Sequence, residues 1–297
     1  MSASPLSQGD HFFEADGVRF HYLVRGSGPL MIIQSLGWGM PGGYLWNGTG
    51  PHLEKKNTVL YFEPRGNGAS SKPADPSTMS AKTMAEDLEH LRIHLGLDAL
   101  PVLMGGSHAG AISLRYAERY PSRVAKLVLF ASQVMDSPKN NNTMNWVTKR
   151  KDDPAYTPAI ATLVELKASG GPKTDEEFQA SLDVLIPWYF SDTTKADILR
   201  RDVAGGPTLP AAYGFVTNLN DAKDENKLPH VAEAGSVTAK TLILWGAEDA
   251  MCSLEAANAL AEGIPDSKLV IIPGVGHFAY IEDPDAFWGE LDPFLES

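Results

Sequence analysis

A serine, an aspartate and a histidine occur along this 297-residue chain in an order that suits nucleophilic catalysis. Ser107 lies in residues 105–110, which read Gly-Gly-Ser-His-Ala-Gly, and Asp249 and His277 follow much later. A serine hydroxyl is a weak nucleophile until a histidine accepts its proton. That histidine in turn needs a carboxylate, which fixes its tautomer and stabilises its charged form. We therefore take Ser107 as the candidate nucleophile, His277 as the candidate base and Asp249 as the candidate acid.

The residues around Ser107 fit a sharp turn from a strand into a helix. Gly105 and Ala109, two residues before and two after it, are small, as such a turn demands, because it presses these positions together. The usual pattern is G-x-S-x-G, and Ala109 departs from it at the last position. A phosphate-binding loop is the alternative, but this segment has neither the G-x-x-x-x-G-K-[ST] nor the G-x-G-x-x-G pattern.

Each candidate follows a compact apolar run of the kind expected for a buried strand. Asp16-Gly17 lies between the first two runs and signals a hairpin, so an antiparallel pair should open the sheet. The later runs alternate with helical patterns at 81–95 and 107–119, which predicts a mostly parallel α/β sheet with helices on both faces. We expect eight strands, near residues 11–14, 18–24, 30–33, 58–62, 101–104, 126–130, 241–245 and 268–272.

The alternation stops between residues 133 and 238, where no convincing strand occurs. Helical patterns at 158–169, 175–190 and 194–203 predict a helical cap inserted after the sixth strand, so that residues 1–132 and 239–297 form the core. The cap is rich in aromatic residues and could roof an apolar pocket. The alternative is that these aromatic residues only pack the insertion onto its base.

The net charge and the cysteine content of the chain limit which ligands and partners it can bind. The 25 Lys and Arg residues against 37 Asp and Glu residues give a formal charge of −12, which repels nucleic acids and anionic membrane surfaces. A single cysteine, Cys252, excludes an intrachain disulfide and a cysteine-based zinc site, and fits a reducing compartment. We expect a cytoplasmic protein that acts on a small-molecule substrate without metal or organic cofactor. Its oligomeric state is left open.

These motifs resemble the α/β-hydrolase superfamily. Residues 246–249, Gly-Ala-Glu-Asp, and 276–278, Gly-His-Phe, are similar to that family's acid and histidine loops. Residues 62–71 resemble its D-x-R-G-x-G-x-S loop, with Glu63 in place of the aspartate and Arg65 as the residue expected to anchor the loop. The likeness runs from about residue 10 to the C-terminus outside the insertion, which lies where the family carries its cap. It implies an eight-stranded α/β-hydrolase sheet.

The resemblance also implies the remaining site residues. The backbone N–H of His108 should form one half of an oxyanion hole. Residues 34–39, Gln-Ser-Leu-Gly-Trp-Gly, carry Leu36 where the family has histidine, and alignment on Gly37 makes Trp38 the second donor, with a shift of one residue as the alternative. Candidate substrate-binding residues are Trp38, His108, Trp188 and Tyr189. Asp136 is the alternative acid, because some members carry theirs after the sixth strand.

Serine hydrolysis of a small, largely apolar ester, thioester or lactone is the expected activity, as in esterases and lactonases. Dehalogenases and epoxide hydrolases use an aspartate where this chain has Ser107. Prolyl aminopeptidases share the Gly-Gly-Ser turn, but they also carry cap acids for the substrate amine, for which Glu165, Glu176 and Glu177 are the unplaced candidates. Carbon–carbon bond hydrolysis uses the same triad. A ligand-binding or non-hydrolytic protein on the same fold is the alternative of another class.

Overall fold

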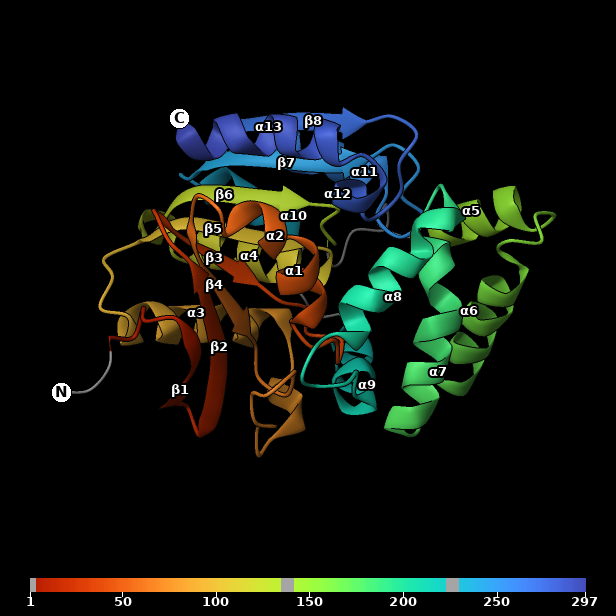
Figure 1. Cartoon of the computed structure of the whole chain (residues 1–297), viewed down its shortest axis with the longest axis horizontal. Helices are drawn as coiled ribbons and strands as arrows, with labels where there is room; N and C mark the ends of the chain where they lie inside the picture. Colours follow the sequence, from red (N-terminus) through yellow and green to blue (C-terminus); the bar gives the residue numbers. More distant parts are fainter. Residues whose placement is uncertain (1–3, 135–141, 223–229) are drawn as a thin grey trace.

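Eight strands form one sheet in the computed structural model, which describes residues 4–134, 142–222 and 230–297 (Figure 1). Their order is β1-β2-β4-β3-β5-β6-β7-β8, with β1 and β4 antiparallel to β2 and all other pairs parallel. The eight predicted strands and the antiparallel start are confirmed. The strands are β1 (Gly9–Ala15), β2 (Val18–Gly26), β3 (Leu30–Gln34), β4 (Thr58–Glu63), β5 (Leu100–Gly106), β6 (Val124–Phe130), β7 (Lys240–Gly246) and β8 (Ser267–Ile272).

The β1–β2 hairpin closes at the predicted Asp16-Gly17 turn. Both residues have a positive φ, 50° for Asp16 and 70° for Gly17, which is the backbone conformation that a two-residue turn of this type requires. Ala15 and Val18 pair directly across it. The turn therefore fixes the register of the antiparallel edge of the sheet.

Alternate residues of each central strand face opposite sides of the sheet. On β6, Leu127 and Leu129 belong to one core cluster, while Val128 and Phe130 belong to the other. The first face is covered by α3 (Ala81–His94), α4 (His108–Arg119) and α11 (Leu254–Gly263), and the second by α1 (Gly43–Gly48) and α13 (Pro284–Glu296). Two short helices, α2 (Gly50–Leu53) and α12 (Ala279–Glu282), precede β4 and α13. Helices on both faces are thus confirmed.

Local sequence explains some helix starts and fails for others. The Ser80 hydroxyl accepts the Thr83 N–H at 3.1 Å and begins α3. By contrast, no helical pattern was identified between the strands near residues 30–33 and 58–62, where the structure has α1. That helix begins at Gly43, directly after Gly42, and its sequence has no recognisable helical pattern. It forms because tertiary packing buries Tyr44 and its two neighbours.

A helical insertion, as predicted, separates β6 from β7 and lies beside the carboxyl ends of the strands (Figure 1, green to teal). It contains α5 (Thr143–Arg150), α6 (Thr157–Ser169), α7 (Asp175–Leu185), α8 (Ala196–Ala204) and α9 (Ala212–Ala222), with 3₁₀ turns at Ile186–Tyr189 and Thr193–Lys195. The predicted helix at 175–190 is therefore shorter and ends in a 3₁₀ turn that contains Pro187.

The end of the inserted segment packs on the core. The short helix α10 (His230–Glu233) and the 3₁₀ turn Ala234–Ser236 contact α4 and α11. Ala234 is fully buried in the same cluster as those helices. Within the described part of the chain, no helix is both long enough and apolar enough to cross a bilayer.

Candidate active site

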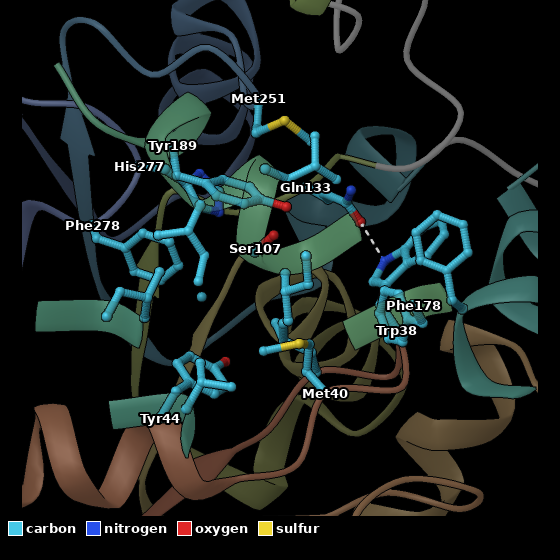
Figure 2. Close-up of a pocket in the computed structure, with 18 of the residues that line it drawn as sticks. Trp38, Met40, Tyr44, Ser107, Gln133, Phe178, Tyr189, Met251, His277 and Phe278 are labelled. Atoms are coloured by element: carbon cyan, nitrogen blue, oxygen red, sulfur yellow. Dashed lines mark hydrogen bonds between the residues drawn. The ribbon is translucent and has the colours of Figure 1, made fainter. Parts of the chain in front are cut away.

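A cavity of about 330 Å³ lies between the carboxyl ends of the strands and the helical insertion (Figure 2). Its polar lining includes Ser107, Gln133, Lys167 and His277. Most of the remaining lining is aliphatic, aromatic or thioether carbon: Leu36, Met40, Phe130, Leu163, Leu166, Phe178, Leu182, Leu185, Ile186, Leu199, Val203, Phe215, Leu219, Met251 and Phe278. Such a cavity favours a substrate that is largely apolar.

Ser107 occupies the strained turn that its sequence predicted. It follows β5 directly, precedes the first residue of α4, and has φ 52° and ψ −128°. The turn tolerates only small neighbours, because a Cβ on Gly105 would lie 2.4 Å from the Ala109 carbonyl oxygen, and one on Gly110 would lie 2.3 Å from Ser132 Oγ. A positive φ at a non-glycine residue costs about 1–3 kcal/mol. The packed turn sustains this strain and presents the Ser107 side chain to the cavity (Figure 2).

Asp249 contacts the His277 ring at its Nδ1 atom. Its Oδ2 lies 2.8 Å from His277 Nδ1, while its Oδ1 accepts the backbone N–H groups of Met251 at 2.8 Å and Cys252 at 2.9 Å. Both side chains are buried. Because an ionised carboxylate can only accept, Nδ1 must carry the ring proton, and Nε2 is left as the acceptor in the neutral ring. His277 and Ser107 line the same cavity (Figure 2). The alternative acid, Asp136, falls outside the described residues.

The loop after β3 lies against the start of α4. The Gly37 N–H donates to His108 Nδ1 at 3.1 Å, and the Gly39 N–H donates to Asn67 Oδ1 at 2.7 Å. These two backbone donors are therefore already used, and Trp38 lies between them. The His108 ring is fully buried and packs edge-on against the Trp38 ring. The His108 ring is not part of the described cavity lining and faces the loop instead, so substrate contact by this side chain stays a prediction.

Gln133 is a cavity residue that sequence reasoning missed. Its Oε1 accepts the indole N–H of Trp38 at 3.3 Å (Figure 2), and its backbone N–H donates to the Ser107 carbonyl. An indole nitrogen can only donate, so the amide must turn its oxygen towards Trp38 and leave its NH₂ group to donate elsewhere. The only feature of the sequence that could have indicated a role for Gln133 was its place shortly after β6, because Ser107 follows the neighbouring strand β5.

The two aromatic residues predicted from the insertion have different places. Tyr189 lines the cavity, and its ring centroid lies 5.5 Å from that of His277. Burial raises the pKa of Tyr189 to about 12, so it stays a neutral hydroxyl. Trp188 is fully buried in a separate cluster with Tyr156 and outside the described lining. The two side chains separate because adjacent residues of the 3₁₀ turn project in different directions, and substrate contact by Trp188 stays a prediction without support from the described lining.

The candidate amine-binding acids do not reach the cavity. Glu165, Glu176 and Glu177 are all exposed, and none belongs to the described lining. Glu177 Oε2 accepts the Lys173 N–H at 2.8 Å beside the start of α7. Lys167, on α6, supplies the ammonium group of the described lining and is exposed.

The predicted anchoring of the 62–71 loop is confirmed. Arg65 donates to both carboxylate oxygens of buried Asp87, with Nε 2.9 Å from Oδ2, and also to Asp16 at 3.0 Å. Glu63, in place of the family's aspartate, accepts the Gly42 N–H at 2.7 Å. Asn67 of the same loop accepts the Gly39 N–H, so the loop is bonded to the segment that carries Trp38 at both Gly39 and Gly42.

Among the described residues, one group has donor atoms close enough to hold a metal ion. The donor atoms of Asp249, Cys252 and His277 lie within 4.8 Å of one another. Asp249 and His277 already bond to each other, and burial raises the pKa of the Cys252 thiol well above its usual value. A raised pKa disfavours the thiolate that a metal requires.

Comparison with known proteins agrees with the fold. A family model described as the alpha/beta hydrolase fold matches residues 28–284. Proline iminopeptidase PfmaB of Pestalotiopsis fici is 24% identical, over 96% of this chain and 99% of its own. Pimeloyl-[acyl-carrier protein] methyl ester esterase of Nitrosomonas europaea is 25% identical, over 90% and 96%. The solved structure of 2-hydroxy-6-oxo-6-phenylhexa-2,4-dienoate hydrolase from Rhodococcus sp. strain RHA1 matches with a TM-score of 0.68 at 18% identity, over 97% and 98%, and shows the fold alone.

Proposed function

The chain belongs to the alpha/beta hydrolase fold family, and we propose that it is a serine hydrolase that cleaves the acyl bond of a small, largely apolar ester, thioester or lactone. One observation carries the proposal: Ser107, in a strained turn, lines the same apolar cavity as His277, whose ring is held by Asp249. Related proteins named as an iminopeptidase and a methyl ester esterase are consistent with a hydrolase but do not choose the bond.

The chemistry follows from the proton positions. Ser107 Oγ attacks the acyl carbon while His277 Nε2 takes its proton, and Asp249 stabilises the resulting imidazolium. His277 then gives the proton to the leaving group, and an acyl-enzyme remains. A water molecule, deprotonated by His277, releases the acid and restores Ser107. The backbone N–H groups of His108 and Trp38 stabilise the negative oxygen of each tetrahedral intermediate, because the adjacent N–H groups of Gly37 and Gly39 are already used.

The charge of the cavity favours an acyl substrate over the alternatives. An aminopeptidase needs an acid beside the substrate amine, but Glu165, Glu176 and Glu177 are exposed and outside the described lining. A dienoate, the substrate in the name of the Rhodococcus enzyme, carries a carboxylate that needs a cation or several donors. In the described lining the ammonium group is that of exposed Lys167. A neutral acyl group fits the buried part of the cavity best.

The test is reaction with a small alkyl fluorophosphonate, followed by intact-mass analysis and peptide mapping. We expect one adduct on Ser107 in the wild-type protein and none in Ser107→Ala. Ser113→Ala is the matched control, because Ser113 is a buried serine on α4, the helix that follows Ser107, and lies outside the described lining. The control should label as the wild type does. No adduct on the wild type, or turnover that persists in Ser107→Ala, would reject the proposal in favour of a ligand-binding or non-hydrolytic protein.

A further inference from the structure

The loop that carries His277 is bonded to the helical insertion. The contact is made by the segment 188–192, which comprises the end of the 3₁₀ turn Ile186–Tyr189 and the residues up to the 3₁₀ turn Thr193–Lys195. The backbone carbonyl of Tyr189 accepts the His277 N–H at 2.8 Å. The Tyr156 hydroxyl donates to two carbonyls of the same segment, each at 3.0 Å. The segment is thus held from both sides and takes part in placing the histidine backbone.

Glu282 bridges the same two parts of the chain with its carboxylate. Its Oε1 accepts the backbone N–H groups of Ser191 at 2.8 Å and Asp192 at 2.9 Å. Its Oε2 accepts the N–H of Gly276, the residue before His277, at 2.6 Å. Only 7% of Glu282 is exposed, and burial raises its pKa while the three N–H donors oppose that rise. Hydrogen bonds to an ionised acceptor are stronger than neutral ones, so this is a firm connection.

The acid loop is bonded to the same segment. The Ser191 hydroxyl donates to Glu248 Oε2 at 2.6 Å, next to Asp249 in the chain. The buried Arg150 donates to the Trp188 carbonyl at 2.7 Å and to the Glu248 carbonyl at 3.4 Å. The segment 188–192 therefore contacts both loops that carry the proposed base and acid.

We propose that Glu282 is a positioning residue for His277: its carboxylate fixes the Gly276–His277 backbone against the segment 188–192 and so aims Nε2 at Ser107. The inference rests on the proposed function, because it gives His277 the role of base. The inference goes beyond the candidate triad, because the alignment of His277 then depends on Glu282, a buried acid outside the triad, and on the backbone of the segment 188–192. A displacement of about 1 Å at a catalytic group lowers the rate by roughly 100-fold.

Glu282→Gln is the diagnostic change, because glutamine has the same shape but replaces one acceptor oxygen with an NH₂ group. That group would face N–H donors on one of the two sides and break the bridge there. We expect kcat per active site to fall by roughly 10- to 100-fold, while KM for a neutral hexanoyl ester changes by less than about twofold, because Glu282 is outside the described lining. Active sites are counted by fluorophosphonate labelling, so a misfolded fraction does not lower the measured kcat.

Glu290→Gln is the matched control. Glu290 lies on α13 and pairs with Lys268 at the surface, so the same chemical change there should leave kcat and KM as in the wild type. Glu282→Asp, which keeps the charge but is one methylene too short to bridge, is the second variant, and its kcat should lie between those of the wild type and Glu282→Gln. The downfield imidazole proton resonance of the His277–Asp249 pair should broaden or shift in Glu282→Gln.

The outcomes separate this inference from the proposed function. If the wild type does not react with the fluorophosphonate, the proposed function fails first. If the wild type reacts and both Glu282 variants keep the wild-type kcat and imidazole resonance, the positioning role alone is overturned. Equal losses in Glu282→Gln and Glu290→Gln would also overturn it, because the effect would then not depend on the bridge.

Discussion

Replacing Asp249 with asparagine should inactivate the protein through the wrong tautomer of His277. The Asp249 Oδ1 position accepts two backbone N–H groups, from Met251 and Cys252, at 2.8 and 2.9 Å. An asparagine must place its carbonyl oxygen there, because an NH₂ group would face two donors and lose both hydrogen bonds. In the wild-type protein, His277 Nδ1 lies 2.8 Å from Asp249 Oδ2. In the variant, the NH₂ group takes the place of Oδ2 and donates to Nδ1, which becomes an acceptor. The ring proton moves to Nε2, which can no longer accept the proton of Ser107.

We expect kcat for a chromogenic hexanoyl ester to fall by about 10⁴-fold in Asp249→Asn, which corresponds to about 5.4 kcal/mol of transition-state stabilisation. The loss should approach that of Asp249→Ala, although asparagine matches aspartate in size. Nitrogen-15 NMR of His277 provides the direct observation: the protonated nitrogen should be Nδ1 in the wild type and Nε2 in Asp249→Asn.

A variant Asp249→Asn that keeps more than about a tenth of the wild-type kcat per active site would refute this reasoning. The comparison variant is Asp136→Asn, which alters the alternative acid. If Asp136→Asn loses the activity and Asp249→Asn keeps it, the acid is Asp136, and the 2.8 Å contact between Asp249 and His277 is structural.

Two further predictions concern charge. Burial raises the pKa of Glu118 from 4.5 to about 8, against the opposing effect of Arg115, so the folded state holds a proton that the unfolded chain has lost between these values. Stability from this group is present below pH 4.5 and is lost as pH rises through 8. The full pKa shift corresponds to roughly 5 kcal/mol of destabilisation at high pH. Glu118→Gln removes this cost but also removes the 3.1 Å ion pair with Arg115, so we expect a net stabilisation of about 2 kcal/mol at pH 9 and nearly none at pH 4, measured by urea unfolding. An equal effect at both pH values would contradict this prediction. For substrates, kcat/KM should favour a hexanoyl over a succinyl ester by roughly 100-fold, because the apolar lining cannot solvate a carboxylate, and equal values would show that the acyl group does not enter this cavity.

The candidate triad was readable from the sequence because its signals are local. Ser107, Asp249 and His277 each follow a run of apolar residues that is typical of a buried strand, and parallel strands bring their carboxyl ends to one edge. The small residues at 105 and 109 are needed within the turn itself, so they also appear in the sequence. The eight strands and the place of the insertion follow from the same short-range patterns.

Residues whose role depends on tertiary packing were not readable. Trp188 and Tyr189 are adjacent aromatic residues with the same expected role, and only the rotation of the 3₁₀ turn sends Tyr189 to the cavity and Trp188 into a separate cluster. Glu282 is an acid near the C-terminus whose partners Ser191 and Asp192 lie about ninety residues away. No periodicity reports a contact between a side chain and a distant backbone N–H.

The segment 188–192 links the wall of the cavity to the loop that carries His277. Opening the cavity at this segment would break the bond between the Tyr189 carbonyl and the His277 N–H, and with it the alignment of the base. Among the described lining residues, Lys167 on α6 is the one with an exposed side chain. On the proposed function, an acyl group in the buried part of the cavity would lie among apolar side chains, and a leaving group directed towards Lys167 would meet an exposed ammonium group. The proposed function therefore predicts a preference for an apolar acyl group together with tolerance of a polar or anionic leaving group.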